Sequence, residues 1–117
     1  MLTSKEIAHL AVKALDDKLA CDIQILKTDK VTVLADYFIL CTAGNSTHGK
    51  TLADEVDKVL SQAGEQPLRR EGYRSGGWTL LDFGCVVVHI FSEEMRSFYS
   101  LDRLWSDAEK IDYKDFL

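Results

Sequence analysis

The seven residues from Cys85 to Phe91 form the longest nearly uncharged apolar run in the chain, and only His89 interrupts it. Valine and isoleucine are frequent in this run, and their branched side chains suit a pleated, crowded surface. Because the run is apolar at odd and even positions alike, neither of its faces can remain in water. It therefore predicts a central strand that is covered on both sides.

A second strand-like segment, Trp78 to Asp82, precedes this run and is separated from it by Phe83-Gly84. So short a break is typical of an antiparallel hairpin, and with Phe83-Gly84 as its loop Trp78 is expected opposite His89. Side chains alternate between the two faces of a strand, which predicts one apolar face and one mixed face. The apolar face comprises Thr79, Leu81, Val86, Val88 and Ile90, and the mixed face comprises Trp78, Leu80, Asp82, Val87 and His89.

At 117 residues the chain is long enough to bury a real core, so residues 1–117 are predicted to form a single domain. Its formal net charge of −5 argues against a primary nucleic-acid binder, because phosphate binding needs clustered Lys and Arg. The same charge suits a basic protein partner. We find no targeting presequence and no stretch long enough to span a membrane, which predicts a cytoplasmic protein without membrane association.

The three cysteines, Cys21, Cys41 and Cys85, are odd in number and scattered, and each lies in or beside a predicted strand. We expect buried, reduced thiols, in keeping with a cytoplasmic setting. The three histidines are equally scattered, and no Cys-x-x-Cys or His-x-x-x-His spacing occurs. Neither a metal site nor a cofactor is predicted.

Two segments show the apolar periodicity of amphipathic helices. A capping-box sequence, Thr3-Ser4-Lys5-Glu6, starts a helix that is expected to run to about Leu19. A second helix is expected over residues 47–63, with Ser46 or Thr47 as its cap and Gly64 in a left-handed conformation after it.

Further strands are expected at 21–26, 37–43 and 68–71, and a short helical turn at 92–96. No element is assigned to the polar tail that begins at Ser106. The resulting order is α-β-β-α-β-β-β-α, with a parallel crossover around the second helix. It predicts an α/β fold in which helices pack on a mixed β-sheet.

Several short segments along the chain form a distinctive series. In order they are Ala35-Asp36-Tyr37-Phe38-Ile39, Gly44-Asn45-Ser46, Glu71-Gly72, Gly77-Trp78, Leu81-Asp82, Gly84, Val86-Val87-Val88-His89-Ile90-Phe91, Arg96-Ser97-Phe98-Tyr99-Ser100-Leu101 and Leu104-Trp105-Ser106-Asp107-Ala108. Together they resemble the ribosomal silencing factor family, also called the Iojap-like family, over essentially the whole domain. One position departs from the family pattern, because the aspartate that usually follows the hairpin glycine is Cys85 here.

The resemblance implies a compact mixed α/β fold with a topology like that of the nucleotidyltransferases. It also implies a non-catalytic function. Members of the family bind the large ribosomal subunit at ribosomal protein L-fourteen and obstruct joining of the small subunit, which damps translation when nutrients are scarce.

An enzymatic alternative follows from the same fold, namely a nucleotidyltransferase-like enzyme with a degenerate or unrecognised metal site. Its chemistry needs two acidic residues, one residue apart, on the strand after the Gly44-Asn45-Ser46 turn, and the 68–71 segment has no such pair. Asp54 and Asp57 are expected on the solvated side of a helix. A triad of Ser46, His48 and an aspartate lacks the Gly-x-Ser-x-Gly context. The chain is therefore predicted not to be an enzyme.

The predicted site is a surface that binds a basic ribosomal protein. Trp78 follows two glycines at the start of a strand and is expected to reach the surface as an aromatic anchor. His89 is either a core histidine hydrogen-bonded to a neighbour or part of the contact. It remains open whether the free protein forms a homodimer through an edge strand or an apolar patch. The candidate contact residues are Trp78, Leu80, Asp82, His89, Arg96 and Tyr99, with Glu71 and Asp102 as further candidates.

Overall fold

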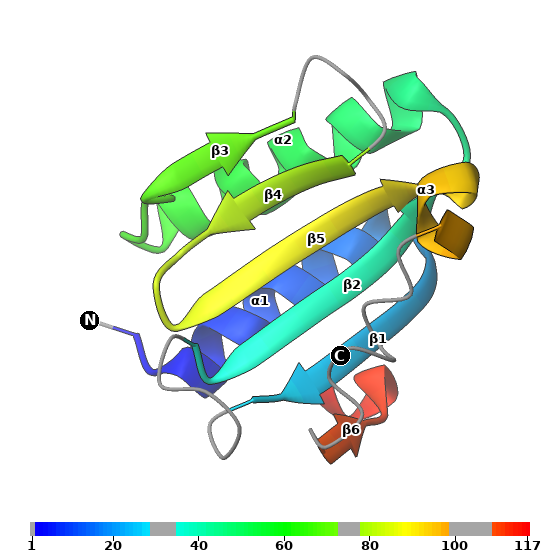
Figure 1. Cartoon of the computed structure of the whole chain (residues 1–117). Helices are drawn as coiled ribbons and strands as arrows, with labels where there is room; N and C mark the ends of the chain where they lie inside the picture. The colour runs from blue at the N-terminus through cyan, green and yellow to red at the C-terminus, as the bar shows by residue number, and fades with distance from the viewer. Residues whose placement is uncertain (1, 29–34, 73–77, 99–108) are drawn as a thin grey trace.

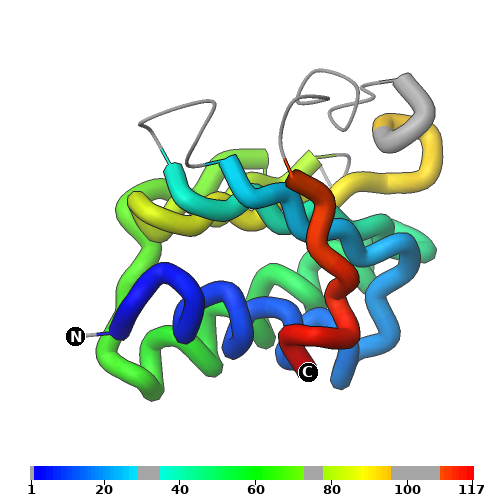
Figure 2. Tube along the Cα trace, turned by 90° about the horizontal axis from the view of Figure 1, so that it is seen from below, coloured from blue at the N-terminus to red at the C-terminus, as the bar shows by residue number. Residues whose placement is uncertain are grey.

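The computed structural model describes residues 2–28, 35–72, 78–98 and 109–117, with the backbone alone for residues 96–98. The strands are β1 (Cys21–Lys27), β2 (Tyr37–Ala43), β3 (Arg69–Glu71), β4 (Trp78–Asp82), β5 (Val86–Ser92) and β6 (Glu109–Ile111), and the helices are α1 (Ser4–Asp17), α2 (Ser46–Gln62), α3 (Glu93–Phe98) and the 3₁₀ helix η1 (Tyr113–Phe116). One mixed sheet runs in the order β3-β4-β5-β2-β1-β6 (Figure 1). Helices α1 and α2 form a second layer against one face of this sheet (Figure 2). The predicted mixed sheet with helices packed on it is confirmed.

Helix α1 begins at the predicted capping box. The Thr3 hydroxyl accepts from the Glu6 N–H (3.1 Å), and the Glu6 carboxylate accepts from the Thr3 N–H (3.1 Å). The hydrogen bond that the carboxylate accepts from the Thr3 backbone is the main cause that lowers the pKa of the Glu6 carboxyl. The helix ends at Asp17, and Leu19 lies beyond it with a φ of 63° and 78% of its surface exposed. The expectation that Leu19 continues the apolar stripe is therefore wrong, because the chain has already turned towards β1.

Helix α2 is capped one residue earlier than predicted. The Asn45 side chain accepts from the His48 N–H at 2.8 Å, so Asn45 is the N-cap and neither Ser46 nor Thr47 is. An asparagine side chain serves this position as well as a hydroxyl does. After the helix, Gly64 has a φ of 93°, which confirms the predicted left-handed residue.

The centre of the sheet is the parallel pair β2–β5, in register from Tyr37 opposite Val86 to Ala43 opposite Ser92. Helix α2 lies between these two strands in the sequence and covers one face of the sheet, which confirms the predicted crossover. Antiparallel pairing adds β4 and β3 on one side and β1 and β6 on the other.

The β4–β5 hairpin differs from the prediction in register but not in its faces. Trp78 lies opposite Phe91 and Leu80 opposite His89, two residues away from the predicted pairing. The cause is at the turn, where the Phe83 N–H donates to the Val86 carbonyl (2.9 Å), so that Phe83 continues the ladder instead of leaving it. A shift of two residues keeps every side chain on its original face. The predicted apolar and mixed faces are both confirmed.

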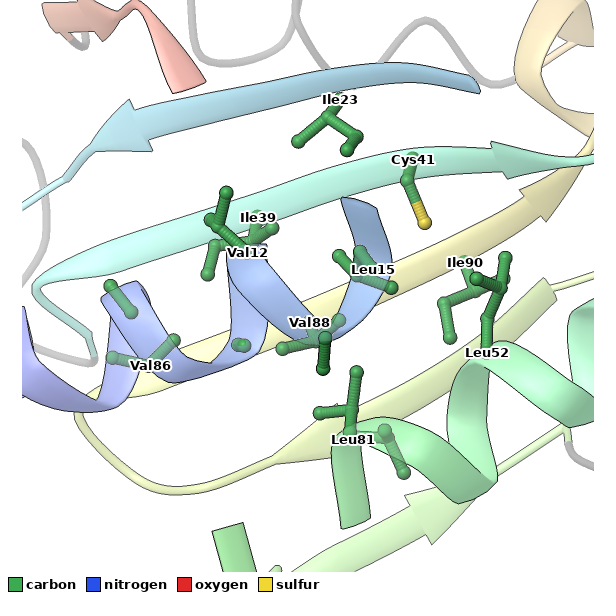
Figure 3. Packing of buried hydrophobic residues seen from close by; sticks show 14 of the residues in the cluster. Val12, Leu15, Ile23, Ile39, Cys41, Leu52, Leu81, Val86, Val88 and Ile90 are labelled. Atoms are coloured by element: carbon green, nitrogen blue, oxygen red, sulfur yellow. The ribbon is translucent and has the colours of Figure 1, made fainter. Parts of the chain in front are cut away.

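The main core lies between the helices and the sheet (Figure 3). Val12 and Leu15 of α1 and Leu52 of α2 meet side chains of four strands there. A smaller cluster of Leu26, Leu40 and Phe91 lies on the other face of the sheet. Strand β5 contributes to both clusters, which confirms a central strand buried on its two faces. The strand residues labelled in Figure 3 are Ile23, Ile39, Cys41, Leu81, Val86, Val88 and Ile90.

The C-terminal residues add two elements that the sequence did not indicate. Strand β6 pairs with β1, and η1 brings Phe116 to a buried position against the His9 ring, with ring centroids 4.4 Å apart. The His9 Nδ1 also lies 3.2 Å from the Phe116 carbonyl oxygen. These contacts attach the end of the chain to α1.

The cysteines are only partly as expected. Cys41 is buried and Cys85 is half-buried, and burial raises the pKa of the Cys85 thiol. Cys21 is exposed, so the expectation of a buried thiol is wrong there. It occupies the first position of β1, before the strand enters the core. Among the described residues, no helix has both the length and the apolar character needed to cross a membrane.

Candidate functional site

The mixed face lies on the side of the sheet away from α1 and α2. Trp78, Leu80 and Asp82 come from β4, and Val87 and His89 come from β5. Four of the six candidate contact residues, Trp78, Leu80, Asp82 and His89, are therefore brought together by strand alternation. The side chain of Arg96 and all of Tyr99 and Asp102 lie outside the description. Glu71, on β3, pairs with Leu80 and so joins the same face.

Two adjacent hollows mark this surface. The first has a volume of about 300 Å³, and the second, of about 240 Å³, is lined by Glu71, Trp78 and Leu80. Leu80 lines both, so the two hollows are neighbours on this face. The first hollow is lined by Ala35, Phe38, Leu68, Arg69, Leu80, Asp82, Gly84, Val87 and His89.

Trp78 is half-buried and packs on its own sheet. Its ring centroid lies 5.1 Å from that of Phe91, and its Nε1–H donates to His89 Nδ1 at 3.2 Å. The indole thus covers the small cluster of Leu26, Leu40 and Phe91 while it lines the second hollow. The expectation of a surface anchor holds for only part of this side chain.

His89 is a buried histidine with 5% of its surface exposed. The rings of Phe38, Trp78 and Phe91 surround it, with centroids 5.2, 6.0 and 6.1 Å away. Burial lowers the pKa of His89 from 6.5 to about 4, and the nearby Asp82 carboxylate opposes this shift. The imidazole is therefore neutral at physiological pH.

This pKa predicts a pH dependence of stability. In the unfolded chain His89 takes up a proton near pH 6.5, while the folded protein resists protonation until about pH 4. The unfolded state therefore binds more protons between these values, so the free energy of unfolding falls as the pH is lowered through this window. The contribution is about 3 kcal/mol, present in full above the window and lost below it.

Denaturant titrations of wild type and His89→Phe at about pH 7 and about pH 4 measure this contribution. The difference between the two proteins cancels the other titrating groups, and wild type should lose more stability than the variant. Equal losses in both proteins would show that His89 is not held neutral by burial.

Asp82 has a role in the hairpin that the sequence did not reveal. Its Oδ1 accepts from the Gly84 N–H at 2.8 Å, which holds the turn, and its Oδ2 lies 3.4 Å from Arg69 on β3. The side chain is 19% exposed. Glu71, at 60%, is the better exposed carboxylate of this surface.

Arg69 of β3 was missed as part of the site, whereas the neighbouring Arg70 points to the α2 side of the sheet. Arg69 lies within 4 Å of the Glu71 and Asp82 carboxylates, and Arg70 contacts Asp57 at 2.7 Å and Asp54 at 3.4 Å. Four carboxylates therefore surround two guanidinium groups, which leaves this edge of the sheet acidic. The sequence Arg-Arg-Glu on a short exposed strand could have indicated ion pairs at this edge, but it does not reveal which carboxylates lie near the arginines.

The residues of the enzymatic alternative have structural partners instead. His48 Nδ1 accepts from the Gly44 N–H (2.9 Å), and its Nε2 lies 2.7 Å from the Lys18 carbonyl oxygen, to which it donates. Both ring nitrogens therefore bind backbone groups, and His48 joins the end of α1 to the start of α2. Asp54 and Asp57 face Arg70. Within the described ranges, no three His, Cys, Asp or Glu side chains gather so that they could hold a metal ion.

Comparisons with known proteins agree with the resemblance seen in the sequence. The family model described as "Ribosomal silencing factor during starvation" matches residues 1–117. The ribosomal silencing factor RsfS of Halalkalibacterium halodurans is 35% identical over 111 residues, which are 95% of each chain. RsfS of Bacillus subtilis is 36% identical over 111 residues, 95% of this chain and 94% of that one.

A solved structure shows the same fold. The crystal structure of a protein from Chromobacterium violaceum matches with a TM-score of 0.88 and 37% sequence identity, over 90% of this chain and 88% of that one. The agreement of sequence and fold along nearly the whole length leaves one assignment. The chain belongs to the ribosomal silencing factor family.

Proposed function

We propose that this protein is a translational repressor that binds the large ribosomal subunit and sterically blocks joining of the small subunit. The observation that carries the proposal is the family match over residues 1–117, whose description names ribosomal silencing during starvation. Two relatives that match over about 95% of this chain carry the same name. The proposed setting is the cytoplasm, under nutrient limitation.

The proposed partner on the large subunit is a basic ribosomal protein, L-fourteen. The net charge of −5 and the Glu71 and Asp82 carboxylates, which flank Arg69 on the mixed face, support a basic partner, because complementary charge favours encounter and excludes like-charged surfaces. The mixed face and its two hollows supply the apolar part of the contact. A folded body of 33 × 32 × 25 Å seated on the joining surface of one subunit keeps the other subunit away.

We propose no catalytic activity for the chain, because His48, Asp54 and Asp57 are engaged by structural partners.

Self-association of the free protein is left open. The two edge strands, β3 and β6, have three residues each and offer few backbone groups to a second copy. Light scattering of the purified protein measures its mass directly.

Cosedimentation with purified large subunits tests the proposal. Wild type should sediment with large subunits and should prevent small subunits from joining them. Leu80→Glu places a charge where the two hollows meet, and we expect it to weaken binding roughly thirtyfold, as loss of an interface hot spot does. Because Leu80 is only half-buried, the variant should still unfold cooperatively.

Lys58→Glu is the matched control, since Lys58 is an exposed residue of α2, in the layer on the other side of the sheet. It changes the net charge more than Leu80→Glu does and should leave binding intact. Sedimentation of wild type with small subunits alone, or with intact ribosomes alone, contradicts the proposed function. Equal binding by both variants places the contact elsewhere on the protein.

A further inference from the structure

The hydrogen bond between Trp78 and His89 determines which imidazole nitrogen carries the proton. The indole Nε1–H can only donate, so His89 Nδ1 must accept, at a distance of 3.2 Å. A neutral imidazole has one N–H group, and in His89 this group is therefore at Nε2. Burial keeps the ring neutral, with a pKa of about 4. His89 is thus held as a single tautomer with its donor on the side away from Trp78.

That donor has no hydrogen-bond partner among the described residues. Leaving a buried N–H unsatisfied is unfavourable, and such groups in native proteins are rare enough to need an explanation. His89 is also one of the residues that line the first hollow. Nε2 itself is buried behind the lining of this hollow, so a group of another molecule that enters the hollow can satisfy the donor once neighbouring side chains move.

The lining of the hollow indicates the chemistry of that molecule. Phe38, Leu80 and Val87 give it apolar walls, and Leu68 lines it as well, although 73% of the Leu68 surface is exposed to water. Arg69 and Asp82 also line it, and the exposed Glu71 carboxylate lies beside Arg69 on β3. This combination fits a protein segment that is basic overall and brings an apolar side chain together with a hydrogen-bond acceptor.

We propose that the first hollow receives such a segment of the basic ribosomal protein, and that an oxygen of this segment accepts the hydrogen bond of His89 Nε2–H. The inference rests on the proposed function and adds the group that gives the contact its specificity. Trp78 is then a positioning residue, because it acts by fixing the His89 tautomer. The half-buried side chains of Phe38 and Leu80 can shift rotamers to admit the oxygen.

Three variants separate this role from a structural one when their affinity for purified large subunits is measured. His89→Phe retains an aromatic ring but has no donor, and binding should weaken about tenfold, the value of one hydrogen bond to an otherwise unsatisfied buried group. His89→Gln restores an N–H group near the position of Nε2 and should recover most of the affinity. Trp78→Phe keeps the ring over Phe91 but removes the indole N–H, and its loss should be smaller than that of His89→Phe.

Nitrogen-15 NMR of the free proteins reports the tautomer without any ribosome. Wild-type His89 should show the Nε2–H form, and Trp78→Phe should show a mixture of both forms. A wild-type His89 protonated at Nδ1 overturns the inference whatever the binding data show.

The binding data also separate this inference from the proposed function. If wild type does not bind large subunits, the proposed function fails and the inference fails with it. If Leu80→Glu loses binding while a folded His89→Phe binds as wild type does, the docking surface stands and the hydrogen bond is refuted. Thermal melts establish folding, and His89→Gln provides a second test should His89→Phe unfold.

Discussion

Replacing Phe91 with alanine is expected to lower the free energy of unfolding by about 3–5 kcal/mol. Phe91 is fully buried and forms, with Leu26 and Leu40, the small cluster on the mixed-face side of the sheet. Trp78 packs on its ring, so truncation leaves a cavity and removes support from the candidate site. Because domains of this size are stable by only about 5–15 kcal/mol, the loss is a large share of the total. Denaturant titration followed by circular dichroism measures it.

Phe38→Ala is the matched control for this prediction. Phe38 belongs to the same cluster but is only partly buried, so the same chemical change should cost much less stability. If the two variants lose equal stability, or if Phe91→Ala unfolds like wild type, the cluster does not depend on Phe91 as the structure indicates.

Gly72→Ala is expected to cost roughly 3 kcal/mol or more, well above an ordinary glycine substitution. Gly72 has a φ of 76°, and a Cβ atom built on it would lie 1.8 Å from the Trp78 carbonyl oxygen. Backbone must therefore move, and Trp78 is the first residue of β4. We expect binding to large subunits to fall as well, because Trp78 lines the second hollow.

Gly64→Ala separates the cost of a left-handed backbone conformation from the cost of the close approach to the Trp78 carbonyl oxygen. Gly64 has a similarly positive φ of 93°, but a Cβ atom there meets nothing within 4 Å. Its replacement should cost only about 1–2 kcal/mol for the left-handed conformation. Thermal and denaturant unfolding of both variants gives the comparison, and similar losses would show that the close approach to Trp78 adds nothing.

The elements that the sequence predicted well are those whose burial repeats with a regular period. Helices α1 and α2 each show an apolar stripe, and β5 shows an apolar run. These patterns indicate which side of each element faces the core, so its secondary-structure type and its position could be predicted. The N-cap at Asn45, the end of α1 and the hairpin register depend on single hydrogen bonds near a turn, and the pattern of apolar residues does not determine these. Strand β6 was missed because Glu109 and Lys110 are exposed and only pairing with β1 makes them a strand.

In the candidate site, too, the positions set by a regular period were predicted, and the individual hydrogen bonds near the turn were not. Alternation along β4 and β5 was enough to place Trp78, Leu80, Asp82 and His89 on one face. The attachment of Asp82 to Gly84 and Arg69 could not be foreseen, because it requires knowing the turn and the neighbour of β4. The sequence did place Trp78 near His89 and offered a core histidine hydrogen-bonded to a neighbour as one alternative, and the bond from Trp78 to His89 agrees with that alternative although the register differs by two residues.

The parallel pairing of β2 with β5 also bears on how the protein acquires its function. Tyr37 and Val86 pair across 49 positions of the sequence (86 − 37), so this joint closes a long loop and is expected to be a late event in folding. The first hollow takes Phe38 from one of these strands and His89 from the other. A newly made chain therefore has no binding surface until β5 has been synthesised and inserted between β4 and β2. Binding competence should appear in one cooperative step, so partly folded chains should not compete for the partner.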